Sequence, residues 1–544
     1  MNKYSLVALS VTGGILTGLA WSGWCSGLIL LISLVPFFLI EDHLFQHRSR
    51  YSANAFFINL LPGFLIFSIM SLGWIRMASL VAAICVIAGM TFLMSFTAWL
   101  AHVVRLRAGN YLSVAAIISF WLGYEYLSLN CDIITPWINL GNGLAKDVIF
   151  IQWYEITGTG GGTLWILSSN LLFSGFLIRS AKPVSRSRLW LLSWILILIV
   201  PALLSVSRYF TIKINPGVKS EIVIIQPNFD PYTEKFRISF EDQLGKVIRM
   251  AEPYISERTE WLVTPETTVD DPVDENDLQG SRYIHMLREI VKRYPCLTII
   301  TGMTTYRTYP SSPVSPTRSA RETGTDHTWY DHFNSALQID TGDIIHIYHK
   351  SKLVPGIEKQ FVSGLGKVIT DILPYLGGTQ WGYGVQKDRT CFTHAGSGIK
   401  VAPVICYESV FGKFLTCYVK NGANAIFIIT NDGWWKNTNG YKQHLHFASI
   451  RAIEARRPVA RAANTGISCT IDIRGRISNK SEWWKGEVIS AGLIPETRIT
   501  PYVRYGDYLL VMGVLISILI LLYVFAGLPI RRKFKKYNSP GFIK

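Results

Sequence analysis

Three residues whose side chains can carry out covalent acyl chemistry stand where apolar runs end: Glu266 after WLVTP, Lys350 after DIIHIYH and Cys406 after VAPVI. A thiol attacks efficiently only as the thiolate, so it needs a neighbouring base or cation that shifts its protonation. Glu266 can accept the thiol proton and pass it to a leaving group. Lys350, as a cation, can lower the thiol pKa and stabilise a tetrahedral oxyanion, helped by the Tyr407 backbone N–H. These residues predict an acyl-transfer site with a cysteine nucleophile.

Spacing alone leaves other interpretations open. Taken singly, Cys406 is more often an inert buried residue than a nucleophile, and Lys352 shares a face with Lys350 if the strand continues. The eight cysteines are scattered, with no C-x-x-C pair and no histidine at zinc-ligand spacing, so they indicate neither a metal site nor a disulfide framework. His444 and His446 are more typical of helix packing than of metal binding. We therefore expect no metal and no cofactor.

From Glu221 onward, short apolar runs alternate with amphipathic segments, a pattern that predicts strands alternating with helices. We predict strands at 221–228, 260–266, 297–303, 332–340, 343–350, 401–408, 425–432, 458–464 and 467–475. We predict helices at 236–254, 282–294 and 441–456, and another that begins near 409. This alternation predicts an α/β layered sheet domain of about 290 residues. The Pro/Ser/Thr-rich stretch 309–328 is predicted to be a mobile surface loop.

The composition indicates a membrane protein. Of the 544 residues, 49% are hydrophobic and 17% charged, and the mean hydropathy is +0.26, whereas soluble chains carry about 25% charged residues. The formal charge of +16 does not indicate a nucleic-acid-binding face, because many Lys and Arg residues lie in short links between apolar runs and in the C-terminal tail. We expect a membrane partner and no nucleic acid.

Eight apolar stretches are long enough to cross ~30 Å of hydrocarbon as helices. They lie at 5–22, 25–40, 54–73, 78–102, 111–128, 161–178, 189–207 and 507–528. The first is alternatively a signal peptide, since Lys3 precedes it. The predicted organisation is a bundle of seven transmembrane helices (1–207), a catalytic domain (208–506), an eighth transmembrane helix (507–528) and a basic cytoplasmic tail (529–544).

The positive charges predict the orientation of the chain. Cytoplasmic loops of membrane proteins carry an excess of Lys and Arg, and the basic residues of alternate links fall on one side. These are Lys3, Arg48, Arg50, Arg105, Arg107, Arg179, Lys182, Arg186, Arg188 and the tail. The short links on the other side carry little positive charge apart from Arg76. The large domain between the seventh and eighth spans is therefore predicted to lie outside the cytoplasm.

Four motifs, in chain order, resemble those of the nitrilase superfamily: TPE at 264–266, HKSKLVPGIE at 349–358, ICYE at 405–408 and NDGWW at 431–435. With seven spans before the domain and one after it, the whole chain is similar to the apolipoprotein N-acyltransferase family. The stretch 440–468 also matches the family pattern at Gln443, His444, Arg451, Glu454, Arg457, Pro458, Arg461, Asn464, Gly466 and Ser468.

The resemblance implies a fold, a reaction and a location. The fold is a nitrilase α/β/β/α sandwich inserted in a bundle of transmembrane helices. The reaction moves a fatty acyl chain from a membrane phospholipid to a cysteine thioester, and then to the N-terminal amino group of a diacylglyceryl-cysteine lipoprotein. The implied location is the bacterial inner membrane, crossed several times, with a periplasmic catalytic domain.

Site roles follow from the resemblance residue by residue. Cys406 is the nucleophile, Glu266 the base and Lys350 the oxyanion partner; Glu358 orients Lys350. Tyr407 and Glu408 match positions that shape the site, although Glu408 is alternatively a structural carboxylate satisfied by Arg461 or another cation.

Two departures from the family pattern concern lipid contact. Many members read L-V-P-F-G-E where this chain has LVPGIE, and many have Lys-Trp where it has Lys235 and Phe236. Phe236 is a candidate lipid contact. The apolar, Gly-containing stretch after Glu358 is a candidate lid or membrane-dipping arm, or alternatively a packed helix and turn. Its candidate lipid contacts are Phe361, Leu365, Ile369, Leu373 and Trp381.

Two other functions remain as alternatives. A membrane-tethered amidase acting on a small amide would use the same three residues, with water as the acceptor. A transporter or receptor would use the outer domain only for binding; the motif context argues against it, as does the lack of clustered ionisable residues within the predicted spans.

Overall fold

The computed structural model describes residues 1–132, 134–180, 187–214, 217–323, 326–359 and 382–527. The predicted tail 529–544 and the candidate lipid contacts Phe361, Leu365, Ile369, Leu373 and Trp381 lie outside these ranges.

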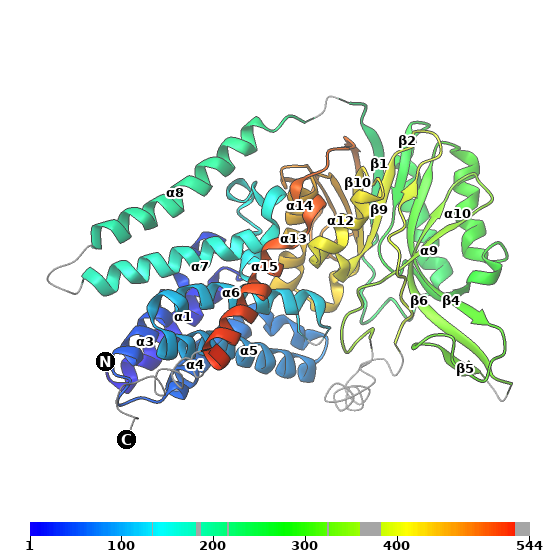
Figure 1. Cartoon of the computed structure of the whole chain (residues 1–544). Helices are drawn as coiled ribbons and strands as arrows, with labels where there is room; N and C mark the ends of the chain where they lie inside the picture. The colour runs from blue at the N-terminus through cyan, green and yellow to red at the C-terminus, as the bar shows by residue number, and fades with distance from the viewer. Residues whose placement is uncertain (133, 181–186, 215–216, 324–325, 360–381, 528–544) are drawn as a thin grey trace, which may run out of the picture.

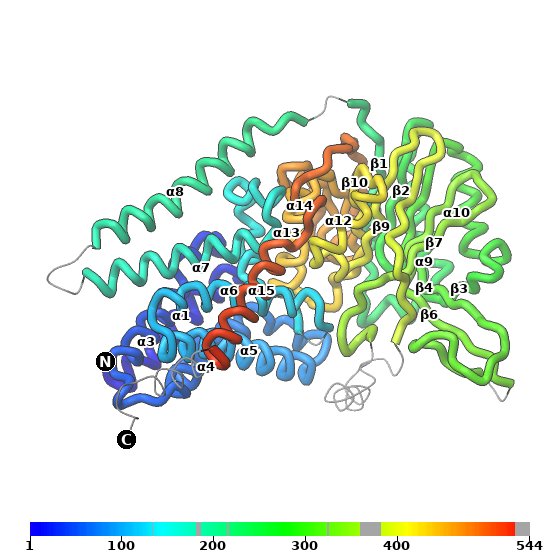
Figure 2. The backbone as a smooth tube through the Cα atoms, in the orientation of Figure 1, coloured from blue at the N-terminus to red at the C-terminus, as the bar shows by residue number. Residues whose placement is uncertain are grey.

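Long apolar helices make up the N-terminal part of the chain (Figure 1). They are α1 (Lys3–Leu19), α2 (Leu30–Ser33), α3 (Val35–Gln46), α4 (Ala53–Leu72), α5 (Leu80–Ala108), α6 (Asn110–Asn130), α7 (Tyr154–Ser180) and α8 (Ser187–Thr211). After the sheet domain, α15 (Tyr508–Leu522) returns to the bundle and packs along α6 (Figure 2).

Seven described segments are long and apolar enough to cross a membrane: Gly27–Gln46, Ala53–Met77, Leu80–Ala108, Asn110–Asn130, Tyr154–Ser180, Ser187–Thr211 and Tyr508–Gly527. They match seven of the eight predicted spans. The first predicted span is α1, whose 17 residues rise only about 25 Å, short of the ~30 Å hydrocarbon core. The count of eight spans is therefore not confirmed.

Two sheets form the second part of the molecule. The eight-stranded sheet has the order β14–β1–β2–β4–β6–β5, with β3 paired to β4 and β7 to β6. Its strands are β1 (Ser220–Gln226), β2 (Thr259–Val263), β3 (Val269–Asp274), β4 (Thr298–Tyr309), β5 (Arg321–Thr323), β6 (Thr328–Ile339), β7 (His346–His349) and β14 (Glu487–Leu493). The six-stranded sheet has the order β13–β12–β11–β10–β9–β8. Its strands are β8 (Phe392–Thr393), β9 (Lys400–Ile405), β10 (Ala425–Thr430), β11 (Val459–Ala463), β12 (Cys469–Ile471) and β13 (Ile477–Ser478).

The two sheets pack between two helical layers, as Figure 1 shows. One layer is α9 (Phe240–Ala251) and α10 (Arg282–Arg293); the other is α12 (Gly412–Lys420), α13 (Asn439–Ala455) and α14 (Pro501–Tyr505). Alternate residues of β1 show the layering: Val223 and Ile225 belong to the core under α9 and α10, whereas Ile222 and Ile224 belong to the core between the sheets. A strand buried on both faces reads as a continuous apolar run. The α/β/β/α expectation is confirmed.

Most predicted elements are present, and the differences lie at edges and loops. The predicted strands correspond to β1, β2, β4, β6, β7, β9, β10, β11 and β12, but β3, β5, β8, β13 and β14 were not predicted. The predicted loop 309–328 contains β5, which pairs with β6. Trp329 Nε1 also donates to Ser312 O at 2.7 Å. Thr317 Oγ1 donates to Asp331 Oδ2 on β6 at 2.6 Å. Backbone and side-chain bonds to β6 therefore hold that stretch against the sheet.

The inner helical layer joins the sheets to the membrane helices. Gln443 on α13 accepts from Trp137 Nε1 at 2.6 Å and donates to Trp21 O at 2.9 Å. Gly158, in α7, has a φ of 60°, and a Cβ there would lie 2.2 Å from the Tyr502 ring. Only glycine fits that backbone and that approach.

Arg456, the C-cap residue of α13, makes buried polar contacts with the membrane part of the molecule. Its fully buried guanidinium donates to Glu155 Oε2 at 2.8 Å and to Gln152 Oε1 at 2.7 Å. The other carboxylate oxygen of Glu155 accepts from Arg208 Nε at 2.6 Å. An arginine of the sheet domain thus neutralises a carboxylate at the start of α7.

Replacing Arg456 with methionine should destabilise the folded chain by about 3–5 kcal/mol, because a buried carboxylate loses one of its partners. Thermal unfolding of detergent-purified protein would measure the change. Arg258→Met is the matched control, since Arg258 is 85% exposed and exposed pairs contribute about 0–1 kcal/mol. Equal unfolding temperatures for both variants would refute the assigned role of Arg456.

Candidate active site

The three predicted catalytic residues lie at strand ends of both sheets. Glu266 is three residues beyond the end of β2, and Lys350 follows β7 directly. Cys406 follows β9, in the other sheet, and begins a short 3₁₀ helix, Cys406–Val410. The two sheets pack face to face, so residues from distant parts of the chain meet between them.

A buried ammonium lies between two carboxylates at the centre of this site. Lys350, which is 1% exposed, donates from Nζ to Glu266 Oε1 and to Glu358 Oε1, each at 2.8 Å. Asn334 Nδ2 donates to the same two oxygens, at 2.8 and 3.1 Å. The Lys350 backbone N–H donates to Asn334 O at 2.8 Å. One cation and one amide therefore fix both carboxylates.

Backbone N–H groups hold the other carboxylate oxygens. Glu266 Oε2 accepts from Asn431 N at 3.1 Å, and Glu358 Oε2 accepts from Val354 N at 2.8 Å. The turn before Glu358 uses Gly356 at a φ of 78°. The sequence LVPGIE thus brings Glu358 to Lys350, despite its departure from the family pattern.

Cys406 has a backbone conformation that costs energy. Its φ is 49°, in the left-handed region that a non-glycine residue rarely adopts, at a cost of about 1–3 kcal/mol. Ser409 Oγ donates to the Cys406 carbonyl at 2.7 Å, and His444 Nε2 lies 3.1 Å from the same oxygen. His444 Nδ1 lies 3.0 Å from Asp432 Oδ1. His444 therefore supports the strained turn by hydrogen bonds, in addition to its packing within the helix.

The electrostatics of the site give its resting protonation. Burial raises the pKa of the Cys406 thiol and the Glu266 charge raises it further, while Lys350 offsets only part of this rise. Burial alone would raise the pKa of Glu266, but the Lys350 ammonium holds it below its usual range. Burial would lower the pKa of Lys350, but Glu266 and Glu358 hold it well above its usual range. The resting site is therefore a thiol, a carboxylate and an ammonium; Lys350 lowers the thiol pKa, as expected, but burial and the Glu266 charge outweigh it.

Glu408 joins the segment after Lys350 to the strand before Cys406. Its Oε1 accepts from Tyr348 Oη and from Ser351 N, each at 2.6 Å, and its Oε2 accepts from Ile405 N at 2.9 Å. Burial raises its pKa to about 6, against the lowering effect of these bonds. Arg461 instead binds Asp432, at 2.5 Å. Among the described residues, Glu408 is satisfied by N–H and hydroxyl donors; the alternative partner Arg461 is wrong.

Tyr407 turns toward the membrane bundle. A side-chain hydrogen bond joins it to Thr135, in the link between α6 and α7. Its ring packs edge-on against Phe411, with 5.1 Å between centroids. Tyr407, which follows Cys406 in the chain, thus contacts the membrane part of the molecule.

The remaining predicted residues lie around the cluster. Lys352 Nζ lies 4.8 Å from the centroid of the Phe411 ring, so the lysine that pairs with Glu266 is Lys350. Phe236 is 65% exposed, whereas its neighbour Lys235 is buried and donates to Thr267 Oγ1 at 2.5 Å. The positive charge of Lys235 also acts on Glu266.

Sequence reasoning missed Asn334 and Lys235. For Asn334 a signal existed, because it is a polar amide in a run that is otherwise largely apolar from Phe333 to Ile339. Lys235 carried no signal apart from its position beside Phe236.

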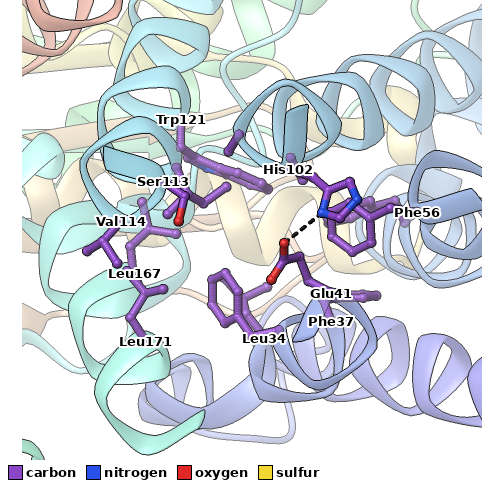
Figure 3. A pocket seen from close by; sticks show the side chains of 15 residues that line it. Leu34, Phe37, Glu41, Phe56, His102, Ser113, Val114, Trp121, Leu167 and Leu171 are labelled. Carbon is purple, nitrogen blue, oxygen red and sulfur yellow. Dashed lines mark hydrogen bonds and ion pairs between the residues drawn. The ribbon is translucent and has the colours of Figure 1, made fainter. Parts of the chain in front are cut away.

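A separate cavity of about 70 Å³ lies within the membrane bundle (Figure 3). His102 Nδ1 lies 2.6 Å from Glu41 Oε1 at this cavity, and Arg105 pairs with Glu41 and with Asp42. Ionisable side chains thus cluster toward the ends of α3 and α5; of these, only His102 falls within a predicted span (25–40 and 78–102). The cavity is lined by residues of the bundle, and none of the strand-end residues lies in it.

Alkylation by a small uncharged thiol reagent should test the protonation of Cys406. Cys406 should label without a reducing agent, but at pH 7.5 at least about tenfold more slowly than the exposed Cys417, because only the thiolate reacts. Its rate should rise with pH beyond the range of an ordinary thiol. Peptide mass spectrometry would follow both sites in one sample, with Cys417 as the internal control. Faster labelling of Cys406 than of Cys417 at neutral pH would contradict a protonated resting thiol.

Comparison with known proteins agrees with this arrangement. Residues 13–172 match the model of the apolipoprotein N-acyltransferase N-terminal domain, and residues 299–500 match that of carbon-nitrogen hydrolase. An apolipoprotein N-acyltransferase of Chlorobaculum tepidum is 27% identical over 507 residues, which cover 92% of each chain. One of Thermotoga maritima is 25% identical over 537 residues, 94% of this chain and 92% of the relative. The first model falls on the bundle and the second on the two sheets, so the chain belongs to the apolipoprotein N-acyltransferase family.

Proposed function

We propose that this multi-pass membrane protein is a lipoprotein N-acyltransferase. It moves a fatty acyl chain from a membrane phospholipid, through a thioester on Cys406, to the N-terminal amino group of a diacylglyceryl-cysteine lipoprotein. The observation that carries the proposal is the buried Lys350 between Glu266 and Glu358, beside a strained cysteine, in a chain of this family. No step requires a cofactor.

In the first half-reaction, the Cys406 sulfur attacks the sn-1 ester carbonyl of the phospholipid. Glu266 accepts the thiol proton as the C–S bond forms. The Lys350 ammonium and the Tyr407 backbone N–H stabilise the oxyanion. The ester C–O bond then breaks, Glu266 returns the proton to the leaving oxygen, and a lysophospholipid departs.

In the second half-reaction, the amino group of the lipoprotein attacks the thioester. An amide C–N bond forms and the C–S bond breaks, while Glu266 carries the proton from the amine to the sulfur. The thiol is regenerated, and the two substrates use one site in turn. This order is a ping-pong mechanism, in which Glu358 positions Lys350 throughout.

The membrane helices favour an acceptor that resides in the membrane. Extracting a lipid into water forfeits ~0.8 kcal/mol per CH₂, which a site at the membrane surface avoids. The amidase alternative is not favoured, because the N-terminal model of the acyltransferase family matches the bundle itself. A small soluble amide requires no such bundle.

We assign the catalytic domain to the periplasmic side of the bacterial inner membrane. Arg48 and Arg50 follow α3, Arg105 and Arg107 end α5, and Arg179 ends α7. These helix ends lie at the opposite ends of their spans from the sheet domain in Figure 1, and positive residues favour the cytoplasm.

Purified protein incubated with phospholipid that carries a labelled sn-1 chain should form a hydroxylamine-sensitive adduct. Adding a diacylglyceryl lipopeptide should then move the label to the peptide as an amide. Cys406→Ala should form no adduct, whereas Cys469→Ala, which replaces another buried cysteine, should form it. A wild-type protein without adduct, or an undiminished adduct on Cys406→Ala, would rule out the mechanism.

Replacing Glu266 with glutamine should slow adduct formation by about 10²–10⁴-fold, the usual contribution of a general base.

The variant Asn334→Ala tests the same role of Glu266 through the pH dependence of the rate. The base acts as a carboxylate, so activity falls as pH drops through its pKa. Loss of the Asn334 hydrogen bond, which lowers that pKa, should move the acid limb of the pH–rate profile upward by about one pH unit.

Gln338→Ala is the control on the same strand, because its amide bonds Asp340 and Thr393 O, away from the base. Its acid limb should match that of the wild type. A slower Asn334→Ala protein with an unshifted profile would assign Asn334 a structural role only.

A further inference from the structure

A basic pocket of about 400 Å³ opens on the side of the sheet domain where α6 ends and α15 begins. Its lining includes four cationic side chains and two acidic ones. These are Lys352, Lys387, Arg389, Lys413, Asp388 and Asp507.

The positive charge of the basic pocket is largely uncompensated. Within the described residues, none of its four cations has an ion-pair partner within 4 Å. Asp507 is buried and accepts a hydrogen bond from Tyr502 Oη at 2.6 Å, so it is already engaged. Burial, with repulsion from Lys359 and Arg389, lowers the pKa of Lys352 although Asp132 opposes this. Such a site favours an anion.

The pocket also has apolar walls. Lys352 lies over the Phe411 ring, and the Arg389 guanidinium lies 4.2 Å from the centroid of Phe414. In both contacts the charged group itself lies over the ring face, so the positive charge and the apolar wall adjoin each other. A ligand with an anionic head and an apolar body matches these walls.

The pocket lies at the ends of two apolar helices. Leu129 and Asn130, which line the pocket, are the last two residues of α6. Asp507, which also lines it, immediately precedes α15. Both helices are among the apolar segments long enough to span a membrane. A lipid headgroup therefore has access to the pocket without leaving the bilayer.

Two connections join the pocket to the active site. Arg389 Nη1 donates to Ser351 Oγ at 2.6 Å, and Ser351 follows Lys350 in the chain. Phe411, in its wall, packs against Tyr407, which follows Cys406. The wall of the pocket is thus in contact with the residues that follow Lys350 and Cys406 in the chain.

We infer that the basic pocket binds the headgroup phosphate of the phospholipid donor and so places its ester near Cys406. The inference rests on the proposed function. Lys and Arg side chains are the usual ligands of phosphate in proteins. The diacylglyceryl acceptor has no phosphate, so the pocket distinguishes the donor from the acceptor and from uncharged glycerides.

The test compares two acyl donors with the same labelled chains, phosphatidylethanolamine and 1,2-diacylglycerol, in micelles of an uncharged detergent. The measured quantity is the ratio of their rates of thioester formation on Cys406. In the variant Lys387→Glu/Lys413→Glu this ratio should fall on the order of tenfold, the scale on which a charged cleft raises the capture of an opposite charge. Lys387→Gln/Lys413→Gln should lower it less.

Arg258→Glu/Lys292→Glu is the charge-matched control, because these side chains are 85% and 70% exposed on the outer part of the domain. Its ratio should equal that of the wild type. Wild-type rates that are equal for both donors, or a ratio unchanged in the Lys387/Lys413 variants, would overturn the inference while leaving the proposed function intact. If neither lipid forms a thioester, the proposed function itself is wrong.

A final arm separates lipid phosphate from free phosphate. Binding of inorganic phosphate alone is measured by calorimetry on the wild type and on Lys387→Glu/Lys413→Glu. If only the wild type binds it and the donor ratio is unchanged between the two proteins, the pocket is a site for free phosphate and the inference is wrong. A fall in the ratio supports the lipid headgroup.

Discussion

One buried ammonium group determines the geometry of the active site. Moving an ammonium ion out of water costs several kcal/mol even after the protein relaxes. Lys350 meets this cost with two carboxylates at 2.8 Å. Each carboxylate in turn depends on Lys350, because two buried acids that share one amide donor would repel each other and take up protons. Glu266, Lys350 and Glu358 therefore form one unit, and the protonation of each depends on the other two.

The fold must bring the parts of this unit together from two sheets. Glu266 and Lys350 come from the eight-stranded sheet and Cys406 from the six-stranded one. Asn431 N, at the end of β10, bonds Glu266, and Glu408 accepts from both Ser351 N and Ile405 N. The Asn431–Glu266 and Ser351–Glu408 bonds cross between the sheets, whereas the Ile405–Glu408 bond fixes the turn that carries Cys406. The packing that buries the core between the sheets thus also sets the distance between Glu266 and Cys406.

The sequence predicts this fold best where apolar runs are continuous. The strands before Glu266, Lys350 and Cys406 are buried runs, so they could be predicted together with their ends. β3 reads Val-Asp-Asp-Pro-Val-Asp, whose acids and proline disfavour a strand, and it forms only because β4 pairs with it. The role of Asn334 depends on the register of β6 against β7. That register is a tertiary property that the sequence alone does not give.

The burial that raises the thiol pKa also serves the proposed chemistry. A preformed thiolate at the membrane surface would react with many electrophiles, whereas a protonated thiol beside a carboxylate reacts only when an ester carbonyl is in place to receive it. Cys406 is only 7% exposed, so water has little access to a thioester formed there. Excluding water protects a reactive intermediate from hydrolysis, which an acyltransferase needs because its intermediate must wait for an amine.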